Sequence, residues 1–459
     1  AYLTAARSLY ETGHLPPERM VTPPGLPLLL APLMALGEVP TLAFRLLAAV
    51  CLAATAVMTW RLFRRGIGGR AAFAAAILVA LSGPLLNQST FLLSEIVFAP
   101  IALSCLLVAA RWHTGQAASK WELFLAGLLA AFASLVRSAG LVLAPVMLWG
   151  CMTNASLPRR RKIIALGLLT AGFCIPQAAW SIRQRAYPEA YGYGTIWTTP
   201  RGIEQTDARG LELQARRLAT FGPQRLADLT QAVIPNHLGW QAISGRAAPL
   251  ARWLIGGGLV VIALVRFVRA RSPTDVFFLL TFGMLALWPW NEGVRLVVPL
   301  IPLVMGYLCW LFVRTFAAVD RYRWPTRALI ALATAFIAAH ALELPYAISS
   351  IKRQGDRTAE RLASMHRVAD WQAANLPENA EVVSVTNAGD NAKLVLIGAS
   401  YFSRRPIAEF VESGKGGKES MTTTPGRFAF VNDAAATNTI PKDLKPLASV
   451  DSFRVYRFE

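Results

Sequence analysis

One charged residue, Arg137, interrupts an apolar stretch that runs from Leu123 to Cys151. A charge inside hydrocarbon is costly unless it has a partner or reaches an interface. The stretch is also too long for one membrane-spanning helix, which needs roughly 20 residues. It therefore predicts two short crossings, 121–136 and 139–151, that turn at Arg137 and Ser138. The guanidinium would then lie at the mouth of a membrane cavity, where it could hold a lipid phosphate.

Composition places this stretch in an integral membrane protein. Of the 459 residues, 54% are hydrophobic and only 16% are charged, whereas soluble domains are about a quarter charged. Uniform apolar runs favour helices over barrel strands. The candidate crossings are 41–60, 71–86, 91–110, 121–136, 139–151, 163–182, 253–267, 276–288, 296–313 and 328–346.

Basic residues gather on alternate short connections between these runs. The intervening connections 83–90, 137–138 and 289–295 carry almost none. The basic set is Arg61, Arg64, Arg65 and Arg70, then Arg111 and Lys120, then Arg159, Arg160, Arg161 and Lys162, then Arg266, Arg269 and Arg271, then Arg314, Arg321, Arg323 and Arg327. The positive-inside tendency assigns this set to the cytoplasm, and the alternation is consistent only if residues 123–151 cross twice. The basic residues behind the net charge of +19 are thus interpreted as setting the membrane orientation and contacting lipids, and not as binding nucleic acid.

This orientation predicts three regions. Residues 1–40 form an outer loop with an amphipathic helix at 2–10 and an interfacial helix at 26–36. Residues 41–346 form the membrane bundle, with an outer loop at 183–251. Residues 347–459 form a small soluble α/β domain with a helix at 357–375 and strands at 381–386, 393–399, 427–431 and 452–458. The segment 414–425 is interpreted as a loop, because it lacks the residue order of a phosphate-binding loop.

Glu95 is the candidate acidic residue, because it follows an outer connection and lies just inside a crossing. A carboxylate there must be solvated, paired or neutral. It is either an acid at the rim of an outward site or a structural charge at a helix start, where the dipole favours it.

Four arginines are predicted at the same outer face as Glu95: Arg45, Arg137, Arg183 and Arg295. Each has a plainer explanation when taken alone. Arg295 could pair with Glu292, Arg45 could reach outward to the interface, and Arg183 lies near Trp180 in an interfacial belt. Their convergence on the face that the positive-inside tendency should keep free favours an outward anion site.

Other chemistry-bearing residues give no pattern. The cysteines, Cys51, Cys105, Cys151, Cys174 and Cys309, all lie in apolar segments. Four of the five histidines, His14, His237, His340 and His366, lack metal-ligand or Ser-His-Asp spacing. No cofactor is predicted, and a divalent metal is left open.

Several loose motifs occur in a specific order. They are YLTAARSLYETGH at 2–14, TPPGLPLLLAP at 22–32, SLVRSAG at 134–140, and Arg295 followed by Pro299 and Pro302. In this order the chain resembles the GT-C glycosyltransferases, in the branch of protein mannosyltransferases and the bacterial aminoarabinose transferase. The resemblance covers most of residues 1–346. It implies a mainly α, polytopic transmembrane bundle, with the 347–459 domain similar to the small outer domain of many bacterial members.

The resemblance also implies an activity. Members transfer a sugar from a polyprenyl-phosphate donor to an acceptor on the extracytoplasmic face of the plasma (inner) membrane. Arginines would stabilise the phosphate, and a carboxylate would act as general base. The acceptor could be a cell-envelope glycan, a lipid or a protein, and the sugar and lipid length stay open.

The chain departs from the family pattern at its beginning. The catalytic Asp of the family precedes the stretch that here begins at Tyr2, and the chain starts at Ala1 rather than Met. We therefore expect an upstream crossing that carries this Asp, and little or no activity from residues 1–459 alone. Glu95 would then position the acceptor or the base.

Two other classes of protein stay as alternatives. A transporter or flippase for an anionic lipid-linked substrate would also carry intramembrane arginines, but it should show a repeat with interrupted helices, which is not seen. A lipid-binding scaffold would explain the outer domain but not cations gathered at one face.

Overall fold

Apolar runs form helices through most of this chain, because a helix satisfies every backbone polar group within its own segment. The computed structural model describes residues 2–15, 23–37, 41–89, 94–185, 208–234, 250, 252–289, 293–319, 323–377, 382–386, 407–412, 428–432, 446–450 and 453–457. Contacts divide the chain into two compact units, Ala1–Ile348 and Ser349–Glu459.

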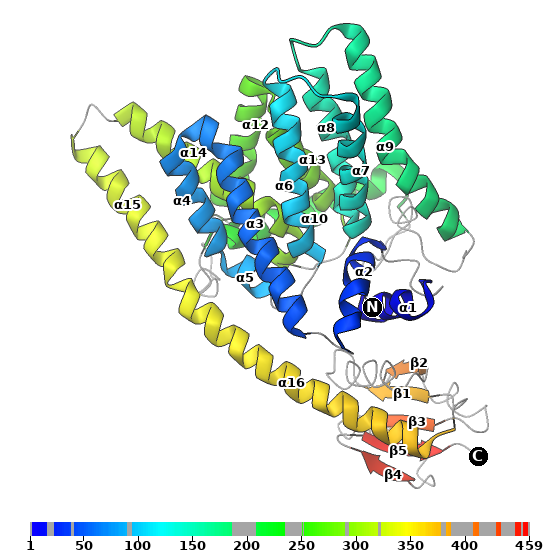
Figure 1. Cartoon of the computed structure of the whole chain (residues 1–459). Helices are drawn as coiled ribbons and strands as arrows, with labels where there is room; N and C mark the ends of the chain where they lie inside the picture. Colours follow the sequence, from blue (N-terminus) through cyan, green and yellow to red (C-terminus); the bar gives the residue numbers. More distant parts are fainter. Residues whose placement is uncertain are drawn as a thin grey trace. The chain divides into compact units, whose positions relative to one another are not determined.

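The first unit is a helix bundle (Figure 1). Its helical elements are α1 (Tyr2–Thr12), α2 (Gly25–Leu30), η2 (Ala31–Leu36), α3 (Thr41–Ile67), α4 (Gly69–Ala80), α5 (Gly83–Ser89), α6 (Ser94–His113), α7 (Lys120–Val136), η3 (Ser138–Val142), α8 (Leu143–Met152), α9 (Arg159–Arg185), α10 (Gly210–Val233), η7 (Arg252–Gly257), α12 (Gly258–Ala270), α13 (Pro273–Ala286), η8 (Gly293–Leu300), α14 (Ile301–Val319) and α15 (Arg323–Ala341). Among the described residues, five helices are long and apolar enough to cross a membrane, and the bent pair α4–α5 could add a sixth. The prediction of a mainly α, multi-pass membrane protein is confirmed.

Several predicted crossings are shorter or less regular than expected. The run 71–86 bends by 50° between α4 and α5. The run 253–267 begins in the π-helical turn η7, and the run 296–313 begins in the 3-10 helix η8. Pro299 lies inside η8 and has no backbone N–H to donate. This explains why the regular α-helix begins only at Ile301.

The segment 183–251 is more than a loop, because residues 210–233 form the helix α10. Buried side chains recur at every fourth position of α10: Leu213, Arg217, Phe221, Arg225, Leu229 and Val233. This spacing gives one buried face on a helix. Apolar periodicity does not reveal this helix, because two of the six buried residues are arginines.

Helices α7 and α9 approach each other at two facing glycines. A Cβ atom on Gly127 would lie 2.4 Å from the Leu169 carbonyl oxygen, and one on Gly172 would lie 2.3 Å from the Phe124 carbonyl oxygen. Small residues allow such close backbone contact in membrane bundles. Because α7 ends one residue before Arg137, this contact also helps to place Arg137.

We expect Gly172→Val to lower the apparent melting temperature of the detergent-solubilised protein. Its new side chain must push α7 and α9 apart, and overpacking of this kind costs about 1–3 kcal/mol. The matched control is Gly167→Val on the same helix, where an added Cβ meets nothing within 4 Å. Equal melting temperatures for the two variants would contradict the close contact.

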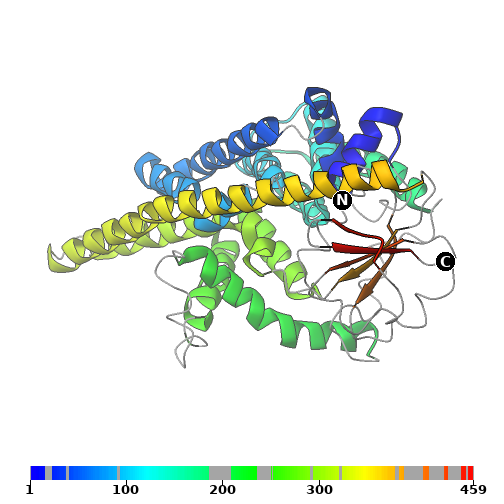
Figure 2. The ribbon, with the colours of Figure 1, turned by 90° about the horizontal axis from the view of Figure 1, so that it is seen from below.

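The second unit combines the end of a long helix with a five-stranded sheet. Helix α16 (Glu343–Asn375) crosses the boundary between the units, and its last turns supply Val368 and Ala369 to the core. The strands are β1 (Val382–Thr386), β2 (Ile407–Glu412), β3 (Phe428–Asn432), β4 (Ala448–Val450) and β5 (Phe453–Arg457). Figure 2 shows the strands beside the gold end of α16.

The sheet has the order β2-β1-β3-β5-β4. Strand β1 pairs in parallel with β2 and β3, whereas β5 pairs antiparallel with β3 and β4. The predicted strands 381–386, 427–431 and 452–458 are confirmed as β1, β3 and β5. Strand β2 and the three-residue β4 were not predicted. The helix predicted to begin at residue 357 begins at Glu343 as α16. The predicted strand 393–399 and loop 414–425 lie outside the described residues.

Candidate functional site

The predicted break at Arg137 is present. Helix α7 ends at Val136, Arg137 has extended backbone angles (φ −152°, ψ 131°), and η3 and α8 follow. The Arg137 N–H donates to the Ala133 carbonyl at 2.9 Å, and its own carbonyl accepts from the Gly140 N–H at 2.8 Å. A Cβ on Gly140 would lie 2.5 Å from the Ser134 nitrogen, so only glycine lets the turn fold back this closely. The predicted break of residues 123–151 into two helical segments at Arg137 is confirmed. That each segment crosses the membrane stays a prediction.

Glu95 lies in the first turn of α6 and is fully buried. Its Oε1 atom accepts from Arg137 Nη1 and from Arg295 Nε. Its Oε2 atom accepts from the Ser94 hydroxyl at 3.1 Å. Glu95 therefore lies at a helix start, as expected if its role is structural. It also joins α6 to two arginines from other elements. A dipole effect at the helix start does not require those two ion pairs.

The two arginines differ in exposure. The Arg137 side chain is 11% exposed and the Arg295 side chain is 33% exposed, whereas Glu95 is at 0%. The cluster contains two guanidinium groups and one carboxylate. Glu292, the alternative partner considered for Arg295, lies outside the described residues.

A small cavity opens beside this cluster, with a volume of about 90 Å³. It is lined by Tyr2, Pro23, Ser94, Val136, Arg137, Ser138, Ala139, Met284, Leu285, Trp288, Arg295 and Leu296. A water molecule occupies roughly 30 Å³ in the liquid, so the space suits about three waters or a single phosphate group. We call this space the Arg137 cavity.

The N-terminal segment forms one wall of the Arg137 cavity. Tyr2 of α1 and Pro23 both line it. A Cβ on Gly25, the first residue of α2, would lie 2.5 Å from the Val136 nitrogen, so α2 packs directly on the end of α7. The segment that was predicted to lie along the membrane surface thus contacts the break at Arg137.

The structure does not bring Arg45 or Arg183 into this cavity. Arg45 is exposed on α3. Arg183 donates from Nη2 to the Leu15 carbonyl at 3.4 Å, so it connects the end of α9 to the N-terminal segment. Of the four arginines singled out from the sequence, Arg137 and Arg295 meet at Glu95.

Sequence reasoning missed a buried arginine behind the cavity wall. Arg225 of α10 donates from Nε to the Leu285 carbonyl at 3.1 Å and from Nη1 to Asp228 Oδ2 at 2.8 Å. Leu285 itself lines the Arg137 cavity. Arg225 therefore fixes the end of α13, which supplies this wall. Among the described residues, no group of three or more His, Cys, Asp or Glu side chains could hold a metal ion.

Comparisons with known proteins agree with this architecture. Residues 21–180 match the family model described as dolichyl-phosphate-mannose-protein mannosyltransferase. This match includes α6, the break at Arg137 and most of α9. The structure is similar to apo ArnT from Cupriavidus metallidurans, with a TM-score of 0.57 at 14% identity over 99% of this chain and 92% of ArnT. The chain has a GT-C glycosyltransferase fold.

Two further structures share this fold. The first is ArnT from Cupriavidus metallidurans bound to undecaprenyl phosphate, with a TM-score of 0.57 at 13% identity over 99% of this chain and 92% of ArnT. The second is an oligosaccharyltransferase from Archaeoglobus fulgidus, with a TM-score of 0.52 at 13% identity over 94% of this chain and 63% of the other. No curated protein sequence matches the chain. The resemblance to the GT-C superfamily that the sequence motifs predict is confirmed.

Proposed function

We propose that this protein is a membrane glycosyltransferase that takes a sugar from a polyprenyl-phosphate donor, with the donor phosphate bound by Arg137 and Arg295. The observation that carries the proposal is the convergence of these two guanidinium groups on buried Glu95 beside a phosphate-sized cavity. The match of residues 21–180 to the mannosyltransferase family model supports it. So does the similarity of the fold to ArnT, which has a structure with undecaprenyl phosphate bound.

The arginines would act on the leaving group. When the bond between sugar and phosphate breaks, negative charge grows on the phosphate oxygens. Fixed guanidinium groups stabilise this charge without reorganising at the moment of reaction. Arg137 is held by Glu95 at one side chain nitrogen, Nη1, so it keeps other donors for a bidentate contact with phosphate.

Glu95 fits a positioning role better than that of a general base. Both of its carboxylate oxygens already accept hydrogen bonds, from two arginines and from Ser94. A general base must reach the proton that it removes, and a fully buried carboxylate engaged on both oxygens has no open side. Glu95 would instead aim Arg137 and Arg295 at the phosphate.

Orientation follows from the charges of the connections. The Arg137 cavity lies at the end of the bundle whose short connections carry almost no Lys or Arg. By the positive-inside tendency this is the extracytoplasmic side. We therefore assign the site to the outer face of the plasma membrane, with Arg45 and Arg183 as anchors at that face. The acceptor would be a cell-envelope glycan, lipid or protein.

Binding of the lipid carrier tests the proposal. The purified chain in nanodiscs should bind undecaprenyl phosphate at least about tenfold more tightly than undecaprenol, because charge-assisted hydrogen bonds to the phosphate contribute about 1.5–3 kcal/mol each. Native mass spectrometry can measure both affinities on the same preparation. Equal binding of the phosphate and the alcohol would refute a phosphate site and with it the proposed donor class.

A further inference from the structure

A larger cavity, of about 850 Å³, lies at the other end of the bundle from the Arg137 cavity. Glu95 lies in the first turn of α6, and His113 is the last residue of this helix. At 1.5 Å per residue these two side chains start about 27 Å apart along the helix, and His113 lines the large cavity. Its walls come from the ends of α3, α6 and α12 and the start of α13. We call it the Arg266 cavity.

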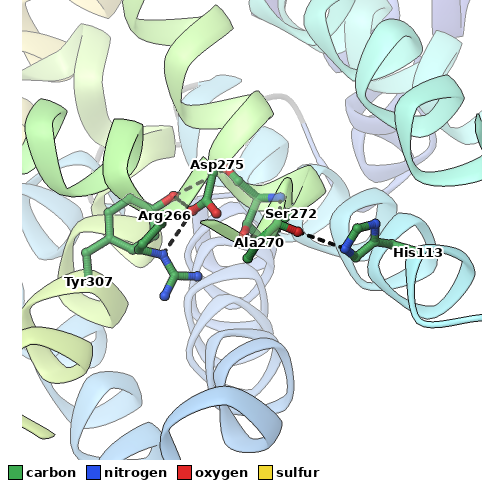
Figure 3. A network of polar contacts seen from close by, with 7 residues as sticks. His113, Arg266, Ala270, Ser272, Asp275 and Tyr307 are labelled. Carbon is green, nitrogen blue, oxygen red and sulfur yellow. Dashed lines mark hydrogen bonds and ion pairs between the residues drawn. The ribbon is translucent and has the colours of Figure 1, made fainter. Parts of the chain in front are cut away.

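Arg266 reaches this cavity in a fixed orientation. Its Nε donates to Asp275 Oδ1 at 3.0 Å, and the Tyr307 hydroxyl donates to the same oxygen at 2.8 Å. The guanidinium also lies over the rings of Tyr307 and Trp310, at 5.0 and 5.2 Å from their centroids. Figure 3 shows its terminal nitrogens pointing away from Asp275.

The terminal nitrogens of Arg266 are available to a ligand. Nε donates to Asp275, and within the described part of the chain the two terminal nitrogens donate no hydrogen bond. The side chain is 15% exposed, whereas Asp275 is at 0%. A guanidinium that is held along one edge by a carboxylate and lies over two aromatic rings presents its other edge as a fixed fork, the geometry that matches phosphate oxygens.

Further cations surround this fork. Arg61, Arg64 and Arg65, in the last turns of α3, all line the cavity. They are exposed, and none forms a salt bridge with a carboxylate in the described ranges. Arg111 also lines the cavity but is already engaged with Gln116 and Glu122. Since Asp275 balances only Arg266, the three α3 arginines give the cavity a net positive charge.

The remaining walls are apolar or rigidly held. Phe63 and Ile67 are buried, and Leu107 and Val108 line the same space. The Nε2 atom of His113 lies 3.1 Å from the Ala270 carbonyl oxygen at the end of α12 (Figure 3). Its Nδ1 atom lies 2.8 Å from Thr153 Oγ1, which directly follows α8, so His113 connects three helices. A cavity of several hundred cubic ångströms with apolar walls and a few convergent polar groups is typical of a ligand site.

We propose that the Arg266 cavity binds the phosphate group of an anionic membrane phospholipid, with Arg266 as the fixed fork and Arg61 and Arg65 as surrounding cations. Basic pockets between membrane helices bind lipid head groups in this way. The apolar walls favour a lipid over a free phosphate, because they would cover glycerol and the first acyl carbons. If these arginines only set the orientation of the protein in the membrane, they would not need to line a cavity. Nor would Arg266 need a buried carboxylate and two aromatic rings to hold it in place.

Lipid retention tests this proposal. The whole chain is reconstituted in phosphatidylcholine nanodiscs that contain phosphatidylglycerol, released into detergent, and analysed by native mass spectrometry for bound phosphatidylglycerol. We expect the double variant Arg61→Gln/Arg65→Gln and the variant Arg266→Gln each to retain about tenfold less, the loss expected for one or two charge-assisted contacts. If Arg266→Gln does not fold, because Asp275 loses its partner, the double variant decides.

The control variant removes two positive charges from a part of the protein that does not line the Arg266 cavity. Arg159→Gln/Arg160→Gln lies on exposed positions of α9 that do not line the cavity. Equal retention in the two double variants overturns the proposal. A second measurement distinguishes a lipid phosphate from free inorganic phosphate. If inorganic phosphate raises the melting temperature of the wild type but not that of the Arg61→Gln/Arg65→Gln variant, and the wild type retains no phosphatidylglycerol, the lipid assignment is wrong. Binding of undecaprenyl phosphate should be unchanged in the double variant, which keeps this test separate from the proposed function.

Discussion

Arg137→Ala should lower the affinity for undecaprenyl phosphate by about tenfold to a hundredfold, the loss expected for one charge-assisted contact. The fold should survive this change, because buried Glu95 keeps Arg295 as its partner. The affinity is measured on the nanodisc-embedded chain by native mass spectrometry, and circular dichroism checks helix content. Binding of undecaprenol should stay at its wild-type level, because the alcohol has no phosphate for Arg137 to contact.

Two further variants make this result specific to the position. Arg45→Ala removes the same charge from the same predicted face, but Arg45 is exposed and does not line the Arg137 cavity. Its affinity should stay within about twofold of wild type, since exposed charges contribute little. Arg137→Lys should recover only part of the affinity, because Lys keeps the charge but loses the planar fork. An Arg137→Ala affinity equal to that of Arg45→Ala would remove Arg137 from the site.

The break at Arg137 could be predicted because the sequence contains a local conflict. Hydrocarbon tolerates neither an unpaired guanidinium nor a helix that is much too long, and both problems are solved by one turn at the same residue. The bundle as a whole followed from similar reasoning on hydropathy. Helix α10 was missed because its buried face includes Arg217 and Arg225, which a search for apolar periodicity does not count.

The composition of the site could be predicted only in part. Hydropathy places a residue at a depth along a crossing, but it does not say which side of the helix faces the bundle. Arg45 and Arg137 were therefore both predicted at the outer membrane face. Of these two arginines, Arg137 lines the Arg137 cavity and Arg45 does not. The contact between Glu95 and Arg295 joins residues 200 positions apart, and no local spacing reveals it.

The network behind the Arg266 cavity was missed for a related reason. Arg266 was counted as one of many cytoplasmic charges, which is the usual explanation for a basic residue near a helix end. Its partners, Asp275 and Tyr307, lie on two other helices. Asp275 was not singled out from the sequence. It lies in the first turn of α13, where the helix dipole favours an acidic residue without any further partner.

Glu95→Gln should destabilise the protein and at the same time make its stability depend more on an anionic ligand. The amide keeps the shape of the side chain but removes the negative charge that Arg137 and Arg295 share. Breaking a buried ion pair typically costs about 3–5 kcal/mol, because the remaining charge is left uncompensated. We therefore expect a clearly lower apparent melting temperature for the ligand-free variant in detergent.

Undecaprenyl phosphate should then raise the melting temperature of Glu95→Gln more than that of the wild type. In the wild type the ligand phosphate shares the two arginines with Glu95, whereas in the variant it supplies their missing counter-charge. Glu122→Gln is the matched control, since Glu122 pairs with Arg111 at 3.6 Å and is 30% exposed. If Glu95 only caps α6, its variant will lose stability but will gain no more from the ligand than the control does. A larger gain with undecaprenyl phosphate than with undecaprenol would identify the phosphate as the group that the two arginines bind.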